Sequence, residues 1–241
     1  MPVSKLTIAV PVFNERERVA RALKELLSTP LPVEAEIVIV DDGSTDGTWD
    51  ELGQLMLPEH VRLMRHERNR GKGAALRTAL EAASGDVFVP FDADLEYDPS
   101  DLPRLLQPLI RDEADAVFGT RAFGSHTAFS YWFVLGNKFL ATWANVLFNC
   151  YISDLETCFK MVRTPVLRSL GLEADSFDIE AEVTAKLLRA GHRPFEVPIQ
   201  YKARTREQGK KIRWQDGVIA LWVITKIRFG RVPNASAPRN V

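Results

Sequence analysis

Two aspartates separated by one residue, Asp92 and Asp94, follow the apolar run VFVPF at 87–91. A carboxylate pair at a strand end can hold a hard divalent cation such as Mg²⁺ or Mn²⁺. Such a cation can bridge the phosphates of a nucleotide and neutralise the charge that grows as a diphosphate leaves. Glu96 is a candidate third ligand. The alternative is an acidic turn next to Asp98.

Three other strand-like runs also end in polar residues. They end in PVFNE at 11–15, DDGS at 41–44 and GTR at 119–121. In an open parallel sheet, ligands bind beyond the carboxyl ends of the strands. Polar residues at the ends of four strands, on one edge of the sheet, therefore predict a ligand-binding site there.

The DGSTDG run at 42–47 is also compatible with the start of a calcium loop, but the sequence does not continue as one. Position 12 of that loop is Gly53 instead of Glu, and the run follows a strand instead of a helix.

Lys72 lies between two glycines where a helix is expected to begin, and the backbone amides there can face an anion. This short motif is neither a P-loop nor a dinucleotide fingerprint, which argues against a dehydrogenase.

The elements that must position these residues alternate along the first half of the chain. Apolar runs predict strands over residues 6–12, 36–40, 61–66, 87–91 and 115–119, and later over 194–201. Amphipathic segments predict helices over residues 15–28, 46–56, 71–83 and 101–112, and later over 177–190 and 216–229, with one or two more in 126–152. This alternation predicts an α/β fold, a doubly wound and mostly parallel sheet with helices on both faces. We expect one domain over 1–230, divided near 122, and a disordered tail at 231–241.

Composition limits the class of protein. The chain has 241 residues, 46% hydrophobic and 26% charged, with a net charge of −1. These values indicate a globular protein and not an electrostatic nucleic-acid binder. Two cysteines exclude a disulfide framework. We expect no signal peptide and no transmembrane helix, hence a cytoplasmic location, with peripheral attachment to the cytoplasmic face of a membrane as a further hypothesis.

The motifs together resemble glycosyltransferase family 2. The first half carries PVFNE at 11–15, VDDGSTDGT at 40–48, RNRGKGAAL at 68–76 and DADLEYDP at 92–99. The second half resembles the polyprenyl- or dolichyl-phosphate sugar synthase branch, including dolichyl-phosphate mannosyltransferases, through SDLETCFK at 153–160, FDIEAEVTAKLLRAG at 177–191, EVPIQYKART at 196–205 and GKKI at 209–212. The resemblance implies a GT-A fold, in which 1–122 binds the nucleotide sugar and 123–230 the acceptor.

The resemblance also implies roles for individual residues. The positions matching those that hold the base and ribose of the donor are Pro11, Phe13, Glu15, Val40 and Asp42. Asp92, Ala93 and Asp94 match the diphosphate–metal motif, and Glu96 matches a further metal ligand. Arg121 and Arg204 match basic residues near the phosphates of donor and acceptor. The family's final lysine is assigned to Lys210 or Lys211, because this sequence has an extra residue and lacks the usual serine.

A basic loop at 202–213 fits a phosphate acceptor. It contains six Lys or Arg residues and one Glu. A lipid monophosphate is mostly dianionic at neutral pH, since its second pKa is about 6. It needs positive charge for positioning more than it needs a base. A solvated surface loop and a nucleic-acid patch are the alternatives.

Several carboxylates and two apolar segments have two interpretations each. Asp154 and Glu156 are candidates for orienting the acceptor or for base catalysis, against helix capping. Glu180 and Glu182 are expected on a helix, where either can simply face water. The aromatic segment 131–152 and the helix at 216–229 can be interfacial, lying on a bilayer, or part of the core.

The sequence therefore predicts an inverting, metal-dependent hexosyltransferase. The expected donor is GDP-mannose or UDP-glucose, and the expected acceptor is a polyprenyl or dolichyl phosphate. A family 2 transferase acting on a glycan or another hydroxyl acceptor is one alternative. A non-catalytic nucleotide-sugar binding protein is the other. A membrane surface or membrane partner protein is a possible further partner, and nucleic acid is not expected.

Overall fold

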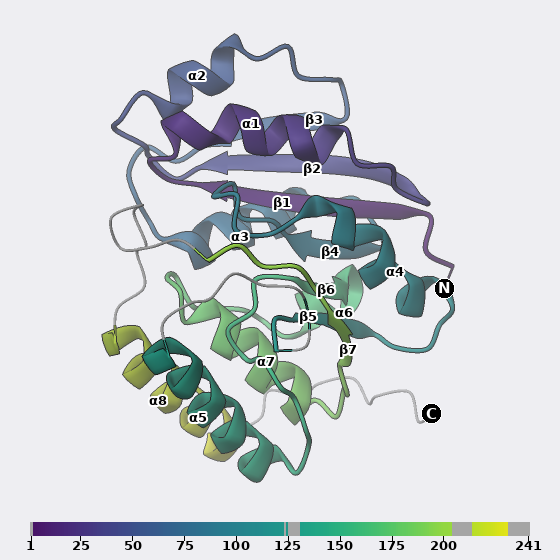
Figure 1. The fold of residues 1–241 in the computed structure, drawn as a ribbon, viewed down its shortest axis with the longest axis vertical. Coiled ribbons are helices and arrows are strands. Elements are labelled where there is room, and N and C mark those ends of the chain that lie inside the picture. The colour runs from purple at the N-terminus through teal and green to yellow at the C-terminus, as the bar shows by residue number, and fades with distance from the viewer. Residues whose placement is uncertain (1, 123, 125–130, 204–213, 231–241) are drawn as a thin grey trace.

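Seven strands form one mixed sheet in the computed structural model, which describes residues 2–122, 124, 131–203 and 214–230 (Figure 1). The strands are β1 (Lys5–Val12), β2 (Glu34–Asp41), β3 (Val61–Arg65), β4 (Val87–Pro90), β5 (Ala116–Thr120), β6 (Lys160–Arg163) and β7 (Phe195–Pro198). Their order across the sheet is β3-β2-β1-β4-β6-β5-β7. The strand β6 runs antiparallel to both of its neighbours, β4 and β5. All other neighbouring strands of the sheet pair in parallel. The predicted strands are present near their expected positions, and β6 was not predicted.

Helices cover both faces of the sheet. They are α1 (Arg16–Leu27), α2 (Thr48–Gln54), α3 (Lys72–Ala82), the 3₁₀ helix η1 (Pro99–Asp101), α4 (Leu102–Ile110), α5 (Tyr131–Phe148), α6 (Thr164–Ser169), α7 (Ile179–Arg189) and α8 (Trp214–Phe229). One core cluster joins the sheet to α1, α2 and α4, and a second joins it to α3, α6 and α7. A third cluster joins α5 and α8 to α7 (Figure 1). The predicted doubly wound α/β fold is confirmed.

Burial on both faces explains why the central strands are continuous apolar runs. In β1, Ile8 and Val10 lie in the cluster beneath α1 and α4, whereas Ala9 lies in the cluster beneath α3. Successive side chains of a strand point to opposite faces, so a covered sheet needs apolar residues at both parities. The covering helices show the complementary helical pattern, as in α4, whose Leu102, Leu105 and Leu109 are fully buried.

Two glycines at the start of α3 allow it to approach the segment before α7. Gly71 has a φ of 99°, in the left-handed region that favours glycine. A Cβ on Gly73 would collide with the backbone oxygen of Ala174, and one on Gly71 with that of Asp175. Close backbone contact here brings the α3 terminus, with Lys72, next to α7.

The two segments with open interpretations, α5 and α8, are each partly core and partly exposed. Leu140 and Ala144 of α5, and Ala220 and Ile224 of α8, are buried in the third cluster. The outward sides of both helices are apolar as well. Within the described ranges, no helix is long and apolar enough to cross a membrane.

Candidate active site

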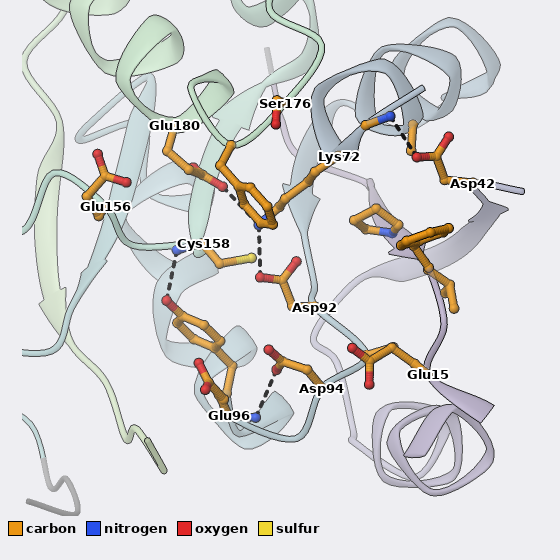
Figure 2. Close-up of a pocket in the computed structure, with 18 of the residues that line it drawn as sticks. Glu15, Asp42, Lys72, Asp92, Asp94, Glu96, Glu156, Cys158, Ser176 and Glu180 are labelled. Atoms are coloured by element: carbon orange, nitrogen blue, oxygen red, sulfur yellow. Dashed lines mark hydrogen bonds and ion pairs between the residues drawn. The ribbon is translucent and has the colours of Figure 1, made fainter. Parts of the chain in front are cut away.

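A cavity of about 400 Å³ lies at the carboxyl ends of β1, β2, β4 and β5 (Figure 2). The polar residues that were predicted at the ends of these parallel strands lie together at one edge of the sheet. The antiparallel strand β6 begins at this same edge, because Phe118 of β5 pairs with Lys160 of β6. The segment that precedes β6 therefore contributes to the cavity. The lining residues are Pro11, Val12, Phe13, Glu15, Asp42, Asn69, Gly71, Lys72, Ala75, Asp92, Ala93, Asp94, Glu96, Tyr97, Arg121, Glu156, Cys158, Ser176, Phe177, Glu180 and Tyr201.

Asp42, just after β2, is held in place by three hydrogen bonds. Its Oδ1 accepts from the backbone N–H of Arg70 at 2.9 Å and its Oδ2 from that of Gly71 at 2.7 Å. Nδ1 of His66 lies 2.6 Å from Oδ1, and Nε2 of the same ring lies 2.9 Å from the Thr78 hydroxyl. These contacts fix the carboxylate relative to the loop that begins α3.

Lys72 connects the two halves of the cavity. Its Nζ lies 2.8 Å from Oδ2 of Asp92 and 3.1 Å from Oε1 of Glu180 on α7 (Figure 2). Burial lowers the pKa of Lys72, but the carboxylates of Asp92 and Glu180 outweigh burial and raise it well above its usual value. Lys72 is therefore charged throughout the physiological range.

Glu180 also binds a second lysine, Lys160, which is buried. Nζ of Lys160 lies 2.8 Å from Oε2 of Glu180 and donates to the carbonyls of Leu155 and Thr157 at 2.9 and 2.6 Å. The expectation that Glu180 and Glu182 can face water is wrong, since both residues are buried. Glu182 accepts from backbone amides of the segment before α7.

Asp94 and Glu96 occupy the loop after β4 with different partners. Oδ1 of Asp94 accepts from the backbone N–H of Glu96 at 3.0 Å. Oε2 of Glu96 accepts from the Tyr201 hydroxyl at 2.6 Å, and burial together with this carboxylate raises the pKa of Tyr201. Among the described residues, no group of three or more Asp, Glu, His or Cys side chains is arranged to hold a metal ion. Asp92 and Asp94 do present hard oxygen ligands on the cavity wall, which suit Mg²⁺ or Mn²⁺.

Arg121, which is partly exposed, and the buried Asp154 form a bidentate ion pair. Nε of Arg121 lies 2.7 Å from Oδ2 of Asp154 and its Nη2 lies 2.7 Å from Oδ1. Asn137 of α5 donates to Oδ1 at 2.8 Å, and the guanidinium lies 5.0 Å from the ring centre of Tyr201. Burial raises the pKa of Asp154, but Arg121 outweighs burial and holds this pKa below its usual value. Neither Asp154 nor Glu156 caps a helix in the structure.

Glu156 is the carboxylate best placed to exchange a proton near neutral pH. Its backbone N–H donates to Oδ1 of Asn137 at 3.2 Å, and its buried Oε1 has no hydrogen-bond partner among the described residues. Burial is the main reason that its pKa rises from 4.5 to about 7. Lys160 partly opposes this rise. Both protonation states of Glu156 are therefore populated at neutral pH.

Most of the residues predicted from the sequence line this cavity. They are Pro11, Phe13, Glu15, Asp42, Lys72, Asp92, Ala93, Asp94, Glu96, Arg121 and Glu156. Asp154 binds Arg121, a lining residue, whereas the Val40 side chain lies in the core beneath α3 and does not line the cavity. Arg204, Lys210 and Lys211 lie outside the described residues.

Sequence reasoning assigned no role to several residues of the site, among them His66, Asn137, Glu180 and Tyr201. One signal was available for Glu180. It lies three residues before Val183 and seven before Leu187, on the buried stripe of α7. A carboxylate on an apolar stripe indicates a buried partner, here a lysine pair.

The family model described as glycosyl transferase family 2 matches residues 7–171, and the chain belongs to this family. It is therefore a glycosyltransferase, with the α/β architecture of the GT-A enzymes.

Two curated relatives match part of the chain. A dolichol-phosphate mannosyltransferase from Pyrococcus furiosus is 33% identical over 48% of this chain and 33% of its own length. A dodecaprenyl-phosphate galacturonate synthase from Rhizobium johnstonii is 32% identical over 48% of this chain and 36% of its own length. The aligned region thus spans about a third of the length of each relative.

A solved structure matches nearly the whole fold. Glucosyl-3-phosphoglycerate synthase from Mycobacterium tuberculosis, in complex with Mn²⁺, UDP and glucosyl-3-phosphoglycerate, superposes with a TM-score of 0.69. The match covers 96% of this chain and 81% of that structure, at 18% sequence identity. At this identity, the likeness supports the fold alone.

Proposed function

We propose that the chain transfers a hexose, with inversion, from GDP-mannose or UDP-glucose to a polyprenyl or dolichyl phosphate. The observation that carries this proposal is that one cavity is lined both by the Asp92–Asp94 pair and by Arg121 and Glu156. A transfer between two substrates needs groups for each of them in the same cavity. The names of the two curated relatives support the lipid-phosphate acceptor.

The donor is assigned to the half formed by residues 1–122. Three hydrogen bonds hold the Asp42 carboxylate at the cavity. A carboxylate fixed in this way is suited to bind the ribose or base of the donor. Asp92 and Asp94 supply the oxygen ligands for Mg²⁺ or Mn²⁺, which when bound neutralises the charge on the leaving diphosphate. The ion pair with Lys72 holds the Asp92 carboxylate in place.

The acceptor is assigned to residues 123–230, together with Arg121. In the proposed reaction, a phosphate oxygen of the acceptor attacks the anomeric carbon of the sugar. The bond from that carbon to the diphosphate breaks and the nucleoside diphosphate leaves, so one in-line displacement inverts the configuration. The phosphate is already ionised and no proton must be removed. Arg121, on the cavity wall, supports binding of this anion.

One observation favours a hydroxyl acceptor as the second candidate. Glu156 has a buried, unbonded oxygen and a pKa of about 7, which suit a general base for a hydroxyl group. This role requires the ionised carboxylate, so transfer would rise with pH up to about 7 and then level off.

A transfer assay with the Glu156→Gln variant separates the two acceptors. Purified protein is incubated with Mn²⁺ or Mg²⁺, radiolabelled GDP- and UDP-sugars and a polyprenyl phosphate, and label is followed into organic solvent. Extracted label that persists in the variant within about threefold supports the phosphate acceptor. If the wild type transfers label only to a glycan or other hydroxyl acceptor, and the variant loses about 10²–10⁴-fold of that activity, the hydroxyl acceptor is correct. No label transfer by the wild type to any acceptor would refute both.

A further inference from the structure

The outward sides of α5 and α8 carry large apolar side chains where surface helices usually carry polar ones. Trp132 is 76% exposed, Val146 71% and Trp222 60%. Among the side chains that the structure describes on the two helices, the exposed large apolar ones are Tyr131, Trp132, Leu135, Phe139, Val146, Val218, Ile219, Trp222 and Phe229, and we call this set the apolar face. Exposed apolar clusters of this kind mark sites of interaction.

The two helices form one continuous platform. They lie side by side on the outer side of α7 (Figure 1), and Nε1 of Trp143 on α5 donates to the Thr225 hydroxyl on α8 at 3.0 Å. Their inner sides are already buried in the third core cluster. The apolar face is therefore not needed to hold the helices on the protein.

The charges on these helices are almost all positive. Lys138 is exposed on α5, which carries no acidic residue, and Asp216 is the single acid of α8. Lys226 Nζ lies 4.9 Å from the ring centre of Trp222, and the guanidinium of Arg228 lies 5.7 Å from that of Phe229. Aromatic rings beside cations, on helices lying flat on the protein, suit the boundary between lipid headgroups and acyl chains. The cations complement a negatively charged lipid surface.

We propose that the apolar face of α5 and α8 docks on an anionic lipid bilayer, with Lys138, Lys226 and Arg228 at the headgroups. A second copy of the chain is the competing occupant. It fits less well, because two such faces would place like cations against each other.

The Asn137 side chain connects α5, which carries part of the apolar face, to the cavity. This residue lies on the side of α5 opposite Leu135 and Phe139. Its side chain bonds both Oδ1 of Asp154 and the backbone of Glu156. One helix thus joins the bilayer to the acceptor wall of the cavity. The relevance of this connection to a lipid-linked acceptor rests on the proposed function, whereas the docking itself does not.

Vesicle cosedimentation without donor or acceptor tests the docking independently of any activity. The full chain is mixed with vesicles of phosphatidylcholine alone, or of phosphatidylcholine and phosphatidylglycerol. We expect binding to the mixed vesicles, weakened about tenfold or more by Trp132→Ser combined with Trp222→Ser. Lys226→Glu should weaken it at least about fivefold, since each cation contributes about that factor at an anionic surface.

Matched controls lie away from the apolar face. Met56→Ser removes a fully exposed apolar side chain in the loop after α2, and Arg21→Glu reverses an exposed charge on α1. Both should bind vesicles as the wild type does. Absence of vesicle binding by the wild type, or equal losses in the control variants, would overturn the proposal. Sedimentation velocity showing a dimer that the double tryptophan variant abolishes would assign the face to a second copy instead. A transfer assay that fails while vesicle binding persists would refute only the proposed function.

Discussion

Replacing Glu156 by Gln should change the pH dependence of stability. The folded protein raises the pKa of this carboxyl from 4.5 to about 7, chiefly through burial. Between these values the folded state keeps a proton that the unfolded state has lost, so the free energy of unfolding falls as pH rises. At about 1.4 kcal/mol per pKa unit, the penalty reaches about 3 kcal/mol above pH 7. Gln copies the protonated form and carries no such penalty.

Urea unfolding of both proteins from pH 4.5 to 8 measures this effect. The difference in unfolding free energy, variant minus wild type, should increase by about 3 kcal/mol across that range. Most other titrating groups are common to both proteins and cancel in the difference. A difference that stays constant with pH, or that decreases, would show that folding does not raise the pKa of Glu156 and would remove the basis for a proton-exchanging role.

Three further predictions concern other residues of the site and its supports. Asp94→Asn should abolish metal-dependent binding of a nucleotide sugar, measured by calorimetry with and without a chelator; unchanged affinity would contradict the proposed metal role. Lys160→Met should destabilise the fold by about 3–5 kcal/mol in urea, since it leaves the carboxylate of Glu180 without its closest partner. Adding Glu180→Gln should recover part of that loss, and strict additivity would argue against a coupled pair. Gly73→Ala should cost about 1–3 kcal/mol because of its backbone collision, whereas Gly53→Ala, with open space around it, should be neutral or stabilising in the same measurement.

The donor side of the cavity could be predicted because short stretches of sequence identify its strands and the polar residues that follow them. Each central strand is a short apolar run, and a parallel sheet brings the ends of such runs to one edge. Asp42 and Asp92 follow two of these predicted strands directly, so their proximity followed from the pattern alone.

The acceptor side depends on contacts that no local pattern encodes. The strand β6 has four residues, two of them Lys160 and Arg163, and charged residues at both ends conceal its burial. Both side chains are paired in the structure, Lys160 with Glu180 and Arg163 with Asp112. Without β6, the position of Glu156 could not be inferred. The exposure of the apolar side chains on α5 and α8 likewise depends on which side of each helix packs on α7.

The reversed direction of β6 places the residues of the cavity on two different kinds of segment. The segment between β5 and β6 leaves the sheet and returns to it at the same edge, where the backbone N–H of Gly119 donates to the carbonyl of Phe159 at 2.8 Å. Its two ends are thus anchored side by side. Asp154 and Glu156 therefore lie on a segment that leaves and re-enters the sheet at one edge, whereas Asp42 and Asp92 follow parallel strands of the sheet itself.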